Sequence, residues 1–476
     1  MLQAILNIFK IPELRNKVIF TLGMLAVYRV GFWIPIPGVD QEMLREAMMR
    51  EVEEGTAAGR ASQFVAIFSG GSFGQSTIFG LGIMPYISAA IIFQILQSVS
   101  ATLKKLKQEG PTGQQKIMTY TRYATIGLCV IQAVGWLMYI NAQGLIYREW
   151  AANPVWWLMA ITAMTAGTTF LMWLGEQIDK YGIGNGVSLI ITAGILAQMP
   201  QAVLWVITNS PVGQIGWIGR IFGIAQTGVE TQMSWMEVIF LVASFVFVVA
   251  GAVLITVAQR RIPVQQAKHT RGRKVYGGQR SYLPLRVNHG GVMPIVFASS
   301  LMIFPSVIFS AMDQGAEGMP AWWRGITGFL SQGFMVGEFP YALLYIGMVY
   351  FFSYFWTTIQ FNPEDMSKQL RDHGSFIPGL RPGPRTAEYL ETVMERITYV
   401  GAGFLSVIAV VPMIVQNAMN IPFFVAAFLG GTGLLIVVSV GLDFIQRIEA
   451  NLLMRNYAGF LGGNDRGQGP KIRGPR

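Results

Sequence analysis

Ten long apolar segments constrain this chain more than any other feature of its sequence. A helix that crosses a membrane needs about 20 consecutive, mostly apolar residues. Stretches of this kind lie near 18–37, 78–98, 117–140, 156–175, 187–207, 237–257, 291–311, 339–359, 396–416 and 423–446. With 52% hydrophobic and 13% charged residues, the chain has more apolar surface than a water-soluble core requires. The sequence therefore predicts an all-α polytopic membrane protein with ten transmembrane helices.

The basic residues gather in alternate connecting loops, which is the pattern that sets membrane orientation. Between Arg260 and Arg286, eight of 27 residues are Lys or Arg and none is Asp or Glu. Such loops are retained on the cytosolic side of a membrane. A cytosolic N-terminus places the C-terminal tail on that same side, together with the loops at 99–116, 176–186, 258–290 and 360–395. The pI of about 9.6 thus indicates topology rather than nucleic-acid binding.

The ten spans divide into two sets of five, and an odd number of spans per set reverses the second set in the membrane. Inverted repeats of this kind commonly enclose a transport path. The predicted units are a cytosolic segment at 1–17, a first half at 18–208, an outer connection at 209–235, a second half at 236–446 and a cytosolic tail at 447–476.

A short apolar segment with three glycines precedes the second span. It covers residues 64–75, reads FVAIFSGGSFGQ and is too short to cross a membrane. As a re-entrant element it requires a cavity, because irregular backbone at membrane depth survives only where protein or water satisfies its amides. The alternative is an ordinary interfacial helix on the outer face.

The sequence lacks the motifs of common membrane enzymes and ATP-driven pumps. It contains no GxxxxGK[ST] nucleotide-binding loop and no HExxH zinc motif, and its three histidines lie in loops or at a span edge. The single cysteine, Cys129, forms neither an intramolecular disulfide nor a thiolate cluster. These absences predict no catalytic residue, no metal and no cofactor.

The predicted spans carry few ionisable residues. Arg29 lies close to the outer end of the first span, and Glu176 and Asp443 lie near cytosolic span ends. An inverted-repeat secondary transporter stays open as an alternative, but ion-coupled transporters usually have charged groups deep in their spans. A path lined by Ile, Val and Leu instead suits a large, variable substrate around which an apolar constriction closes.

Nine segments, spread over almost the whole chain, resemble segments of a known protein family and occur in the same order. They read IPELRNKVIFTL from Ile11, YRVGFWIPIPG from Tyr28, LGIMPYISAAIIFQIL from Leu81, QEGPTGQQKIMTYTRY from Gln108, FLMWLGEQIDKYGIGNGVSLII from Phe170, GRKVYGGQRSYLPLRVNHGGVMPIVFASS from Gly272, FNPEDM from Phe361, GSFIPGLRP from Gly374 and IPFFVAAFLGGTGLLIVV from Ile421. Through these segments the chain resembles the SecY family, whose members are the large subunit of the bacterial protein-translocation channel.

The resemblance implies ten helices in two inverted halves around an hourglass pore, with a lateral gate between spans two and seven. Unfolded secretory preproteins cross the pore, whereas signal sequences and nascent membrane proteins leave sideways into the membrane lipids. The implied partners are SecE, SecG and a motor, which is the SecA ATPase or a translating ribosome. The implied location is the plasma (inner) membrane of a bacterium, with both termini cytosolic.

The family's pore ring falls on five branched apolar residues, namely Ile83, Ile87, Ile191, Val296 and Ile436. Val296 stands where isoleucine is expected, which implies a slightly wider ring at that point. A branched apolar ring deforms around any side chain and excludes water when it is empty. Without the resemblance, each of these residues is interpreted as ordinary packing inside a span.

The resemblance also places a plug and a gate. The FSGGSFG stretch matches the family's plug, a short helix that fills the outer funnel of the resting channel, with the residues Phe64, Phe68, Ser69, Gly70, Gly71, Ser72, Phe73 and Gly74. Gln94 and Asn288 match polar positions of the lateral gate. A hydrogen bond between them in lipid would be worth roughly 0.6 to 2 kcal/mol. The alternative is that each side chain merely faces the headgroup region.

Two cytosolic loops match the surfaces on which family members receive SecA and the ribosome. They contribute Arg271, Arg273 and Lys274 in the basic loop and Arg381 in a turn stiffened by two prolines. Guanidinium groups on a stiff turn form bidentate contacts with carboxylate or phosphate, so contact with ribosomal RNA is compatible with the same chemistry. The alternative for the basic loop is a retention signal alone. Glu364 stands where a basic residue is common in the family, so that position is a weaker candidate.

Overall fold

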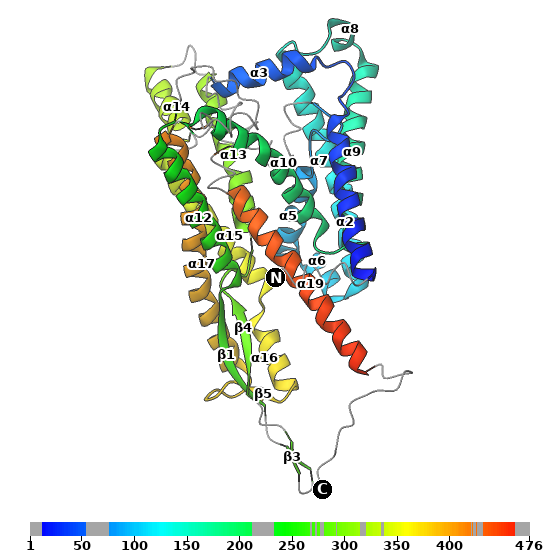
Figure 1. The fold of residues 1–476 in the computed structure, drawn as a ribbon, viewed down its shortest axis with the longest axis vertical. Helices are drawn as coiled ribbons and strands as arrows, with labels where there is room; N and C mark the ends of the chain where they lie inside the picture. Colours follow the sequence, from blue (N-terminus) through cyan, green and yellow to red (C-terminus); the bar gives the residue numbers. More distant parts are fainter. Residues whose placement is uncertain are drawn as a thin grey trace.

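The computed structural model describes residues 12–53, 76–211, 233–266, 269–271, 274–276, 280–291, 293–314, 320–334, 338–419, 421, 425 and 432–461. These residues form a bundle of long helices with a β-hairpin projecting from one end (Figure 1). The first five long helices are α2 (Pro12–Val30), α5 (Met84–Val99), α7 (Pro111–Ala142), α9 (Pro154–Tyr181) and α10 (Gly186–Asn209). The next five are α12 (Trp235–Val257), α13 (Met293–Gln314), α15 (Phe339–Gln360), α17 (Pro384–Met419) and α19 (Thr432–Leu461). A long helix thus stands at each of the ten predicted spans.

Length and apolar character single out a subset of these helices as membrane spans. Among the described residues, six helices are long and apolar enough to cross a membrane. The number rises to seven if α5 and the short α6 (Ala101–Gln108), which meet at a bend of 100°, count as one span. The prediction of an all-α polytopic membrane protein is confirmed at this level.

The packing of the helices repeats between the two sets of five. In the first set α2 contacts α9, α5 contacts α7, α7 contacts α9 and α9 contacts α10. In the second set α12 contacts α17, α13 contacts α15, α15 contacts α17 and α17 contacts α19. Numbered by order within each set, the same pairs touch. This repeat supports two halves of five helices, while the exact unit boundaries stay a prediction.

Local sequence signals fix where several helices begin. α9 starts at Pro154, which needs no amide hydrogen there, and the Asn153 side chain accepts a hydrogen bond from the Val155 amide at 3.0 Å. α12 starts after Ser234, whose amide donates to the Glu237 carboxylate at 2.9 Å in a capping box. α17 starts at Pro384, directly after Gly383 at φ 144°. Each of these helix-start signals can be recognised in the sequence alone.

Several helices extend beyond the predicted spans. α17 begins 12 residues before the predicted start at 396, and α19 runs to Leu461, past the predicted end at 446. The loop predicted at 360–395 also contains α16 (Pro363–Asp372), and the loop at 99–116 contains α6. An apolar run marks the part of a helix that lies in lipid, whereas a helix continues into water as long as its residues favour it.

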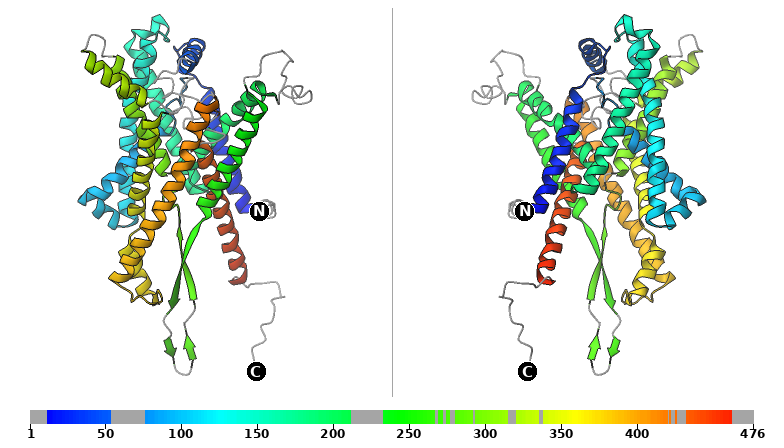
Figure 2. Two further views of the ribbon diagram at one scale, coloured as in Figure 1. Left: turned by 90° about the vertical axis from the view of Figure 1, so that its left-hand side faces the viewer. Right: turned by 90° about the vertical axis from the view of Figure 1, so that its right-hand side faces the viewer.

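Four strands not expected from the sequence build the projecting hairpin. β1 (Gln259–Gln266) pairs antiparallel with β4 (Arg280–Arg286), and β2 (His269–Arg271) pairs with β3 (Lys274–Tyr276) farther out. Ile262 and Val264 point to one face of β1 and are buried, while Arg261 and Pro263 beside them are exposed. This end of the bundle is called the hairpin end (Figure 2).

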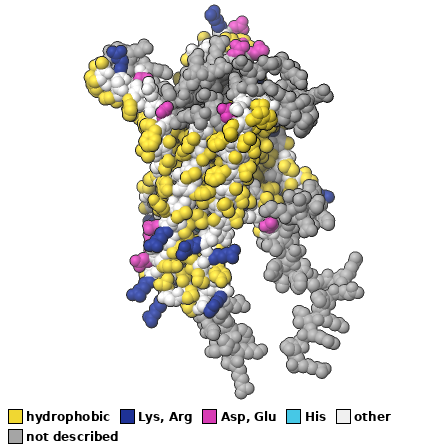
Figure 3. All heavy atoms as spheres, turned by 60° about the vertical axis from the view of Figure 1, so that its left-hand side comes forward, with side chains coloured by type: hydrophobic (Ala, Val, Ile, Leu, Met, Phe, Trp, Pro, Cys, Tyr) yellow, Lys and Arg dark blue, Asp and Glu magenta, His cyan; other side chains and the backbone are white. Residues whose placement is uncertain are grey.

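The opposite end, called the distal end, carries the short helices α3 (Gln41–Glu53), α8 (Arg148–Ala151) and α14 (Ala321–Gly333) (Figure 1). The 3₁₀ turn η1 (Gly31–Trp33) follows α2 directly. Two tryptophan indoles secure the connections here: Trp156 Nε1 donates to the Pro37 carbonyl at 2.7 Å, and Trp136 Nε1 donates to Ser76 Oγ at 3.0 Å. On the face shown in Figure 3, hydrophobic side chains cover the bundle between its two ends, and Lys and Arg gather below them at the hairpin end. This distribution is the surface that a bilayer requires.

Candidate functional site

The five predicted ring residues come together in the interior of the bundle. Ile83 is the N-cap residue of α5 and Ile87 lies in its first turn, while Ile191 belongs to α10, Val296 to α13 and Ile436 to α19. All five are buried, with exposed fractions between 1% and 8%, and all belong to one apolar cluster. Two of these four helices come from each half of the chain. The cluster therefore joins the halves near the middle of the molecule.

The start of α10 is held tightly against the preceding helix. A Cβ atom at Gly186 would collide with the Gly175 carbonyl oxygen, so only glycine allows this approach. Asp179 Oδ1 accepts a hydrogen bond from the Gly186 amide at 2.7 Å, and Asn185 Oδ1 accepts one from the Ser188 amide at 3.2 Å. The close turn fixes the position of Ile191, one turn farther along α10.

A polar cavity of about 470 Å³ lies on the hairpin side of this cluster. Helices of both halves line it, and we call it the hairpin-side cavity. Its lining includes Gln94, Asn185, Ser188, Thr256, Arg286, Asn288, His289, Met293, Trp356, Gln360, Ser439, Val440, Asp443, Gln446 and Arg447. Val440 also belongs to the buried cluster that holds the five ring residues. The cavity therefore ends on the apolar cluster.

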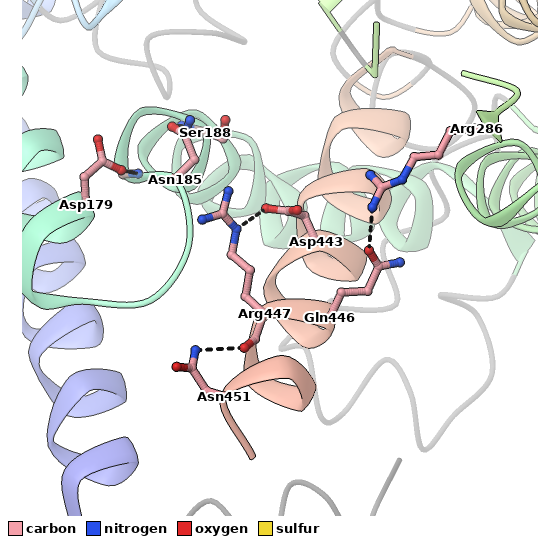
Figure 4. A network of polar contacts seen from close by, with 9 residues as sticks. Asp179, Asn185, Ser188, Arg286, Asp443, Gln446, Arg447 and Asn451 are labelled. Atoms are coloured by element: carbon pink, nitrogen blue, oxygen red, sulfur yellow. Dashed lines mark hydrogen bonds and ion pairs between the residues drawn. The ribbon is translucent and has the colours of Figure 1, made fainter. Parts of the chain in front are cut away.

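Charged and amide groups crowd one wall of the hairpin-side cavity (Figure 4). Arg447 Nε donates to Asp443 Oδ2 at 2.8 Å on α19, and Arg286 Nη2 donates to Gln446 Oε1 at 3.4 Å. Arg286 ends strand β4, so this second contact links the hairpin to α19. Burial, together with the positive charge of Arg286, lowers the pKa of His289 below its ordinary value of 6.5. The sequence shows Arg286 only as part of a basic loop and Asp443 as a charge near a span end, because a pairing across 160 residues such as Arg286 with Gln446 leaves no local pattern.

The two predicted gate residues line the same cavity from different halves. Gln94 belongs to α5, and Asn288 precedes α13. The structure contains no hydrogen bond between these two described side chains. Asn288 Nδ2 instead donates to the carbonyl of Gly291 at 2.8 Å, within its own turn. Both residues thus line one cavity without a direct hydrogen bond between their side chains, and the gate stays a prediction.

The two predicted docking loops form one structure. β5 (Ser375–Phe376) pairs antiparallel with β1, so the second loop adds a strand to the hairpin. Beneath this sheet, Ile262, Leu285 and Ile377 pack against α17 in a buried cluster. Arg381 is exposed on the following turn, and its carbonyl accepts a hydrogen bond from Thr386 Oγ1 at 2.8 Å. We call the hairpin, β5 and this turn the docking platform.

The structure describes some of the remaining predicted residues. Arg271 and Lys274 pair across β2 and β3, at the outer end of the hairpin. Arg273 and the whole predicted plug at 64–75 lie outside the described residues. Glu364 is exposed at the start of α16. Within the described residues, no group of three or more His, Cys, Asp or Glu is placed to hold a metal ion.

A bundle of long apolar helices, with a polar cavity that ends on an apolar cluster between its two halves, defines an integral membrane protein of the polytopic all-α class. The model of the SecY family matches residues 77–445. The chain is 38% identical to the protein translocase subunit SecY of Thermotoga maritima over 477 residues, covering 100% of both chains. It is 39% identical to that of Escherichia coli K12 over 454 residues, covering 94% of both. The chain belongs to the SecY family.

Solved structures of channels share the fold. A structure described as that of a protein conducting channel matches with a TM-score of 0.57, at 17% identity, over 94% of this chain and 95% of the other. Sec61, from a canine ribosome-channel complex of the endoplasmic reticulum, matches with a TM-score of 0.56, also at 17% identity, with the same coverage. At this identity the likeness concerns the fold. Together with the family, it makes this chain an integral membrane channel for polypeptides.

Proposed function

We propose that this chain is the central subunit of a protein translocase and that its substrate follows the path built above. An unfolded secretory polypeptide enters the hairpin-side cavity and crosses the ring of Ile83, Ile87, Ile191, Val296 and Ile436. Signal sequences and nascent transmembrane helices leave between α5 and α13 into lipid, past Gln94 and Asn288. The chain supplies the path and has no catalytic residue or cofactor of its own.

One observation carries this proposal: a polar cavity, lined by both halves, ends on a cluster of branched apolar side chains contributed by four helices. Polar walls keep an arriving unfolded chain hydrated. The apolar cluster closes when empty and offers no specific hydrogen bond, so it accommodates any sequence. A transporter of small polar solutes would instead need fixed polar or charged groups at this narrow point.

The driving partner docks on the platform in this proposal. Arg271, Arg273, Lys274 and Arg381 provide guanidinium and ammonium groups for acidic side chains of SecA, or for a ribosome and its RNA phosphates. Because β5 joins the two loops, force applied to either is shared by both. The small helical subunits SecE and SecG complete the complex. In the same proposal, residues 64–75 are the plug that fills the outer funnel of the resting channel.

The proposed location is the plasma (inner) membrane of a bacterium. The relatives from Thermotoga maritima and Escherichia coli, both bacteria, support it. The basic platform supports an orientation with the hairpin end and both termini in the cytosol, because loops rich in Lys and Arg stay on that side.

The test is site-specific photocrosslinking from Ile191 to a secretory chain stalled midway through the membrane. A matched control probe replaces Leu196 on the same helix, whose side chain is 43% exposed and lies on another face of α10 than Ile191. Adducts from Ile191 alone would support passage through the ring. Equal adducts from both positions would exclude this path, and so would the lack of any adduct in a complex shown to be engaged. Either result would favour the alternative of a secondary transporter.

A further inference from the structure

The distal end carries an amphipathic helix whose apolar face points away from the protein. α14 exposes Trp322, Ile326 and Phe329, which are 66%, 48% and 71% exposed. Their spacing of four and three residues places them on one face of a helix. Thr327, on the other face, is fully buried. In water this arrangement would be unfavourable, because large apolar side chains are hydrated while small polar ones are sequestered.

A carboxylate on the neighbouring helix fixes this orientation. Asp313, near the end of α13, accepts hydrogen bonds from Thr327 Oγ1 at 3.3 Å and from Ser331 Oγ at 3.1 Å. Thr327 and Ser331 lie four residues apart and therefore share the inward face of α14. With that face bound to Asp313, the face carrying Trp322 and Phe329 must point outward. The exposure is thus enforced by specific polar contacts.

The position of α14 identifies what covers its outer face. α14 directly follows α13, packs against α13 and α15, and lies at the periphery of the distal end (Figure 2). The hydrophobic surface of the bundle continues onto the lobe that contains α14 (Figure 3). Because α14 precedes the distal start of α15, which belongs to a helix long and apolar enough to cross a membrane, it lies near the level at which a membrane surface would meet the bundle. Tryptophan is enriched at that level, where its ring meets both apolar chains and hydrated headgroups.

We propose that α14 is an interfacial anchor that inserts Trp322, Ile326 and Phe329 into the lipid leaflet at the distal end. The occupant of its outer face is a lipid surface. Arg324 and Gln332 are exposed on the flanks of the helix and remain with the headgroups and water. Through Asp313, the anchor holds the end of α13 at a fixed depth in the membrane.

The test measures depth directly with nitroxide spin labels on single cysteines. Cys129 is the one cysteine of the chain and is buried, so Cys129→Ala gives a background without thiols. Ile326→Cys and Phe329→Cys carry labels on the apolar face, and Arg324→Cys and Gln332→Cys are matched controls on the same helix. If Cys129→Ala impairs folding, the buried native thiol is kept and the exposed cysteines are labelled selectively.

The complete translocase is reconstituted into vesicles of phosphatidylethanolamine and phosphatidylglycerol. Power saturation then compares the accessibility of each label to oxygen, which concentrates in lipid, and to Ni(II)-ethylenediaminediacetate, which stays in water. We expect the oxygen-to-nickel ratio at 326 and 329 to exceed that at 324 and 332 by about threefold or more. Equal ratios at all four positions would place α14 in water and overturn the proposal. Low accessibility to both reagents at 326 and 329 would mean that another polypeptide covers this face, which also overturns it.

Discussion

At the scale of single residues, the proposed path depends on apolar side chains with no polar function of their own. Ile191 makes no directed contact that distinguishes it from a packing residue; its significance comes from the partners that four helices bring to it. For this reason composition and spacing alone interpret it as core. The family resemblance selects it, and the five selected residues share one buried cluster.

Replacing a ring residue by a polar one should open the resting channel to ions. We expect Ile191→Asn to raise the ion conductance of reconstituted vesicles several-fold, because an amide in the constriction lets water remain there. Leu196→Asn, on another face of the same helix, is the matched control and should leave conductance unchanged. Planar-bilayer recordings of both variants measure the difference. Equal ion conductance of the two variants would mean that Ile191 does not contribute to the seal of the resting channel.

Glycine positions inside the helices offer a paired test of packing. A Cβ atom at Gly167 in α9 would collide with the Ile78 carbonyl oxygen, whereas nothing lies within 4 Å of one at Gly127 in α7. We expect Gly167→Ala to destabilise the protein by about 1–3 kcal/mol. Gly127→Ala should be neutral or stabilising by up to about 1 kcal/mol. Thermal unfolding midpoints in one detergent compare the variants. A decrease in the midpoint for Gly127→Ala as large as that for Gly167→Ala would contradict the packing argument.

At the scale of elements, the sequence predicts the positions of the long helices better than it predicts the docking platform. Apolar runs of about 20 residues are strong local signals. The hairpin rests on a weaker one, since only Ile262 and Val264 show alternation in a strand rich in Arg and Gln. The pairing of β5 with β1 joins segments more than a hundred residues apart, and no local pattern encodes it. The contact between Arg286 and Gln446 escapes prediction for the same reason.

Charge reversal on the platform should separate docking from membrane insertion. We expect Arg381→Glu to abolish most SecA-driven export, because a carboxylate on this exposed turn repels the acidic groups that an arginine would bind. Arg385→Glu makes the same charge change four residues later, at the start of α17, and should retain most export. Translocation of a radiolabelled preprotein into membrane vesicles measures both variants at matched protein levels. Normal export by Arg381→Glu would mean that Arg381 does not take part in docking.

At the scale of the whole molecule, two similarly packed sets of five helices meet around a central cluster. α10 and α19 make a direct contact across this boundary, and on the hairpin side the boundary widens into the polar cavity. A channel that releases helices sideways must part along such a boundary without unfolding either half. Packing that is extensive within each half, with an apolar cluster between the halves, suits this movement.

Locking the two halves together should therefore block lateral release. Gln94 and Asn288 line one cavity from opposite halves, so Gln94→Cys with Asn288→Cys can be joined by a short bis-maleimide in a Cys129→Ala background. We expect the crosslink to prevent a nascent transmembrane helix from reaching lipid, assayed by its resistance to carbonate extraction. The control pair, Gln94→Cys with Ser188→Cys, lines the same cavity but lies within the first half, so its crosslink should leave insertion intact. Normal insertion with the interhalf crosslink complete would mean that helices leave by another route, because α5 and α13 could then no longer separate.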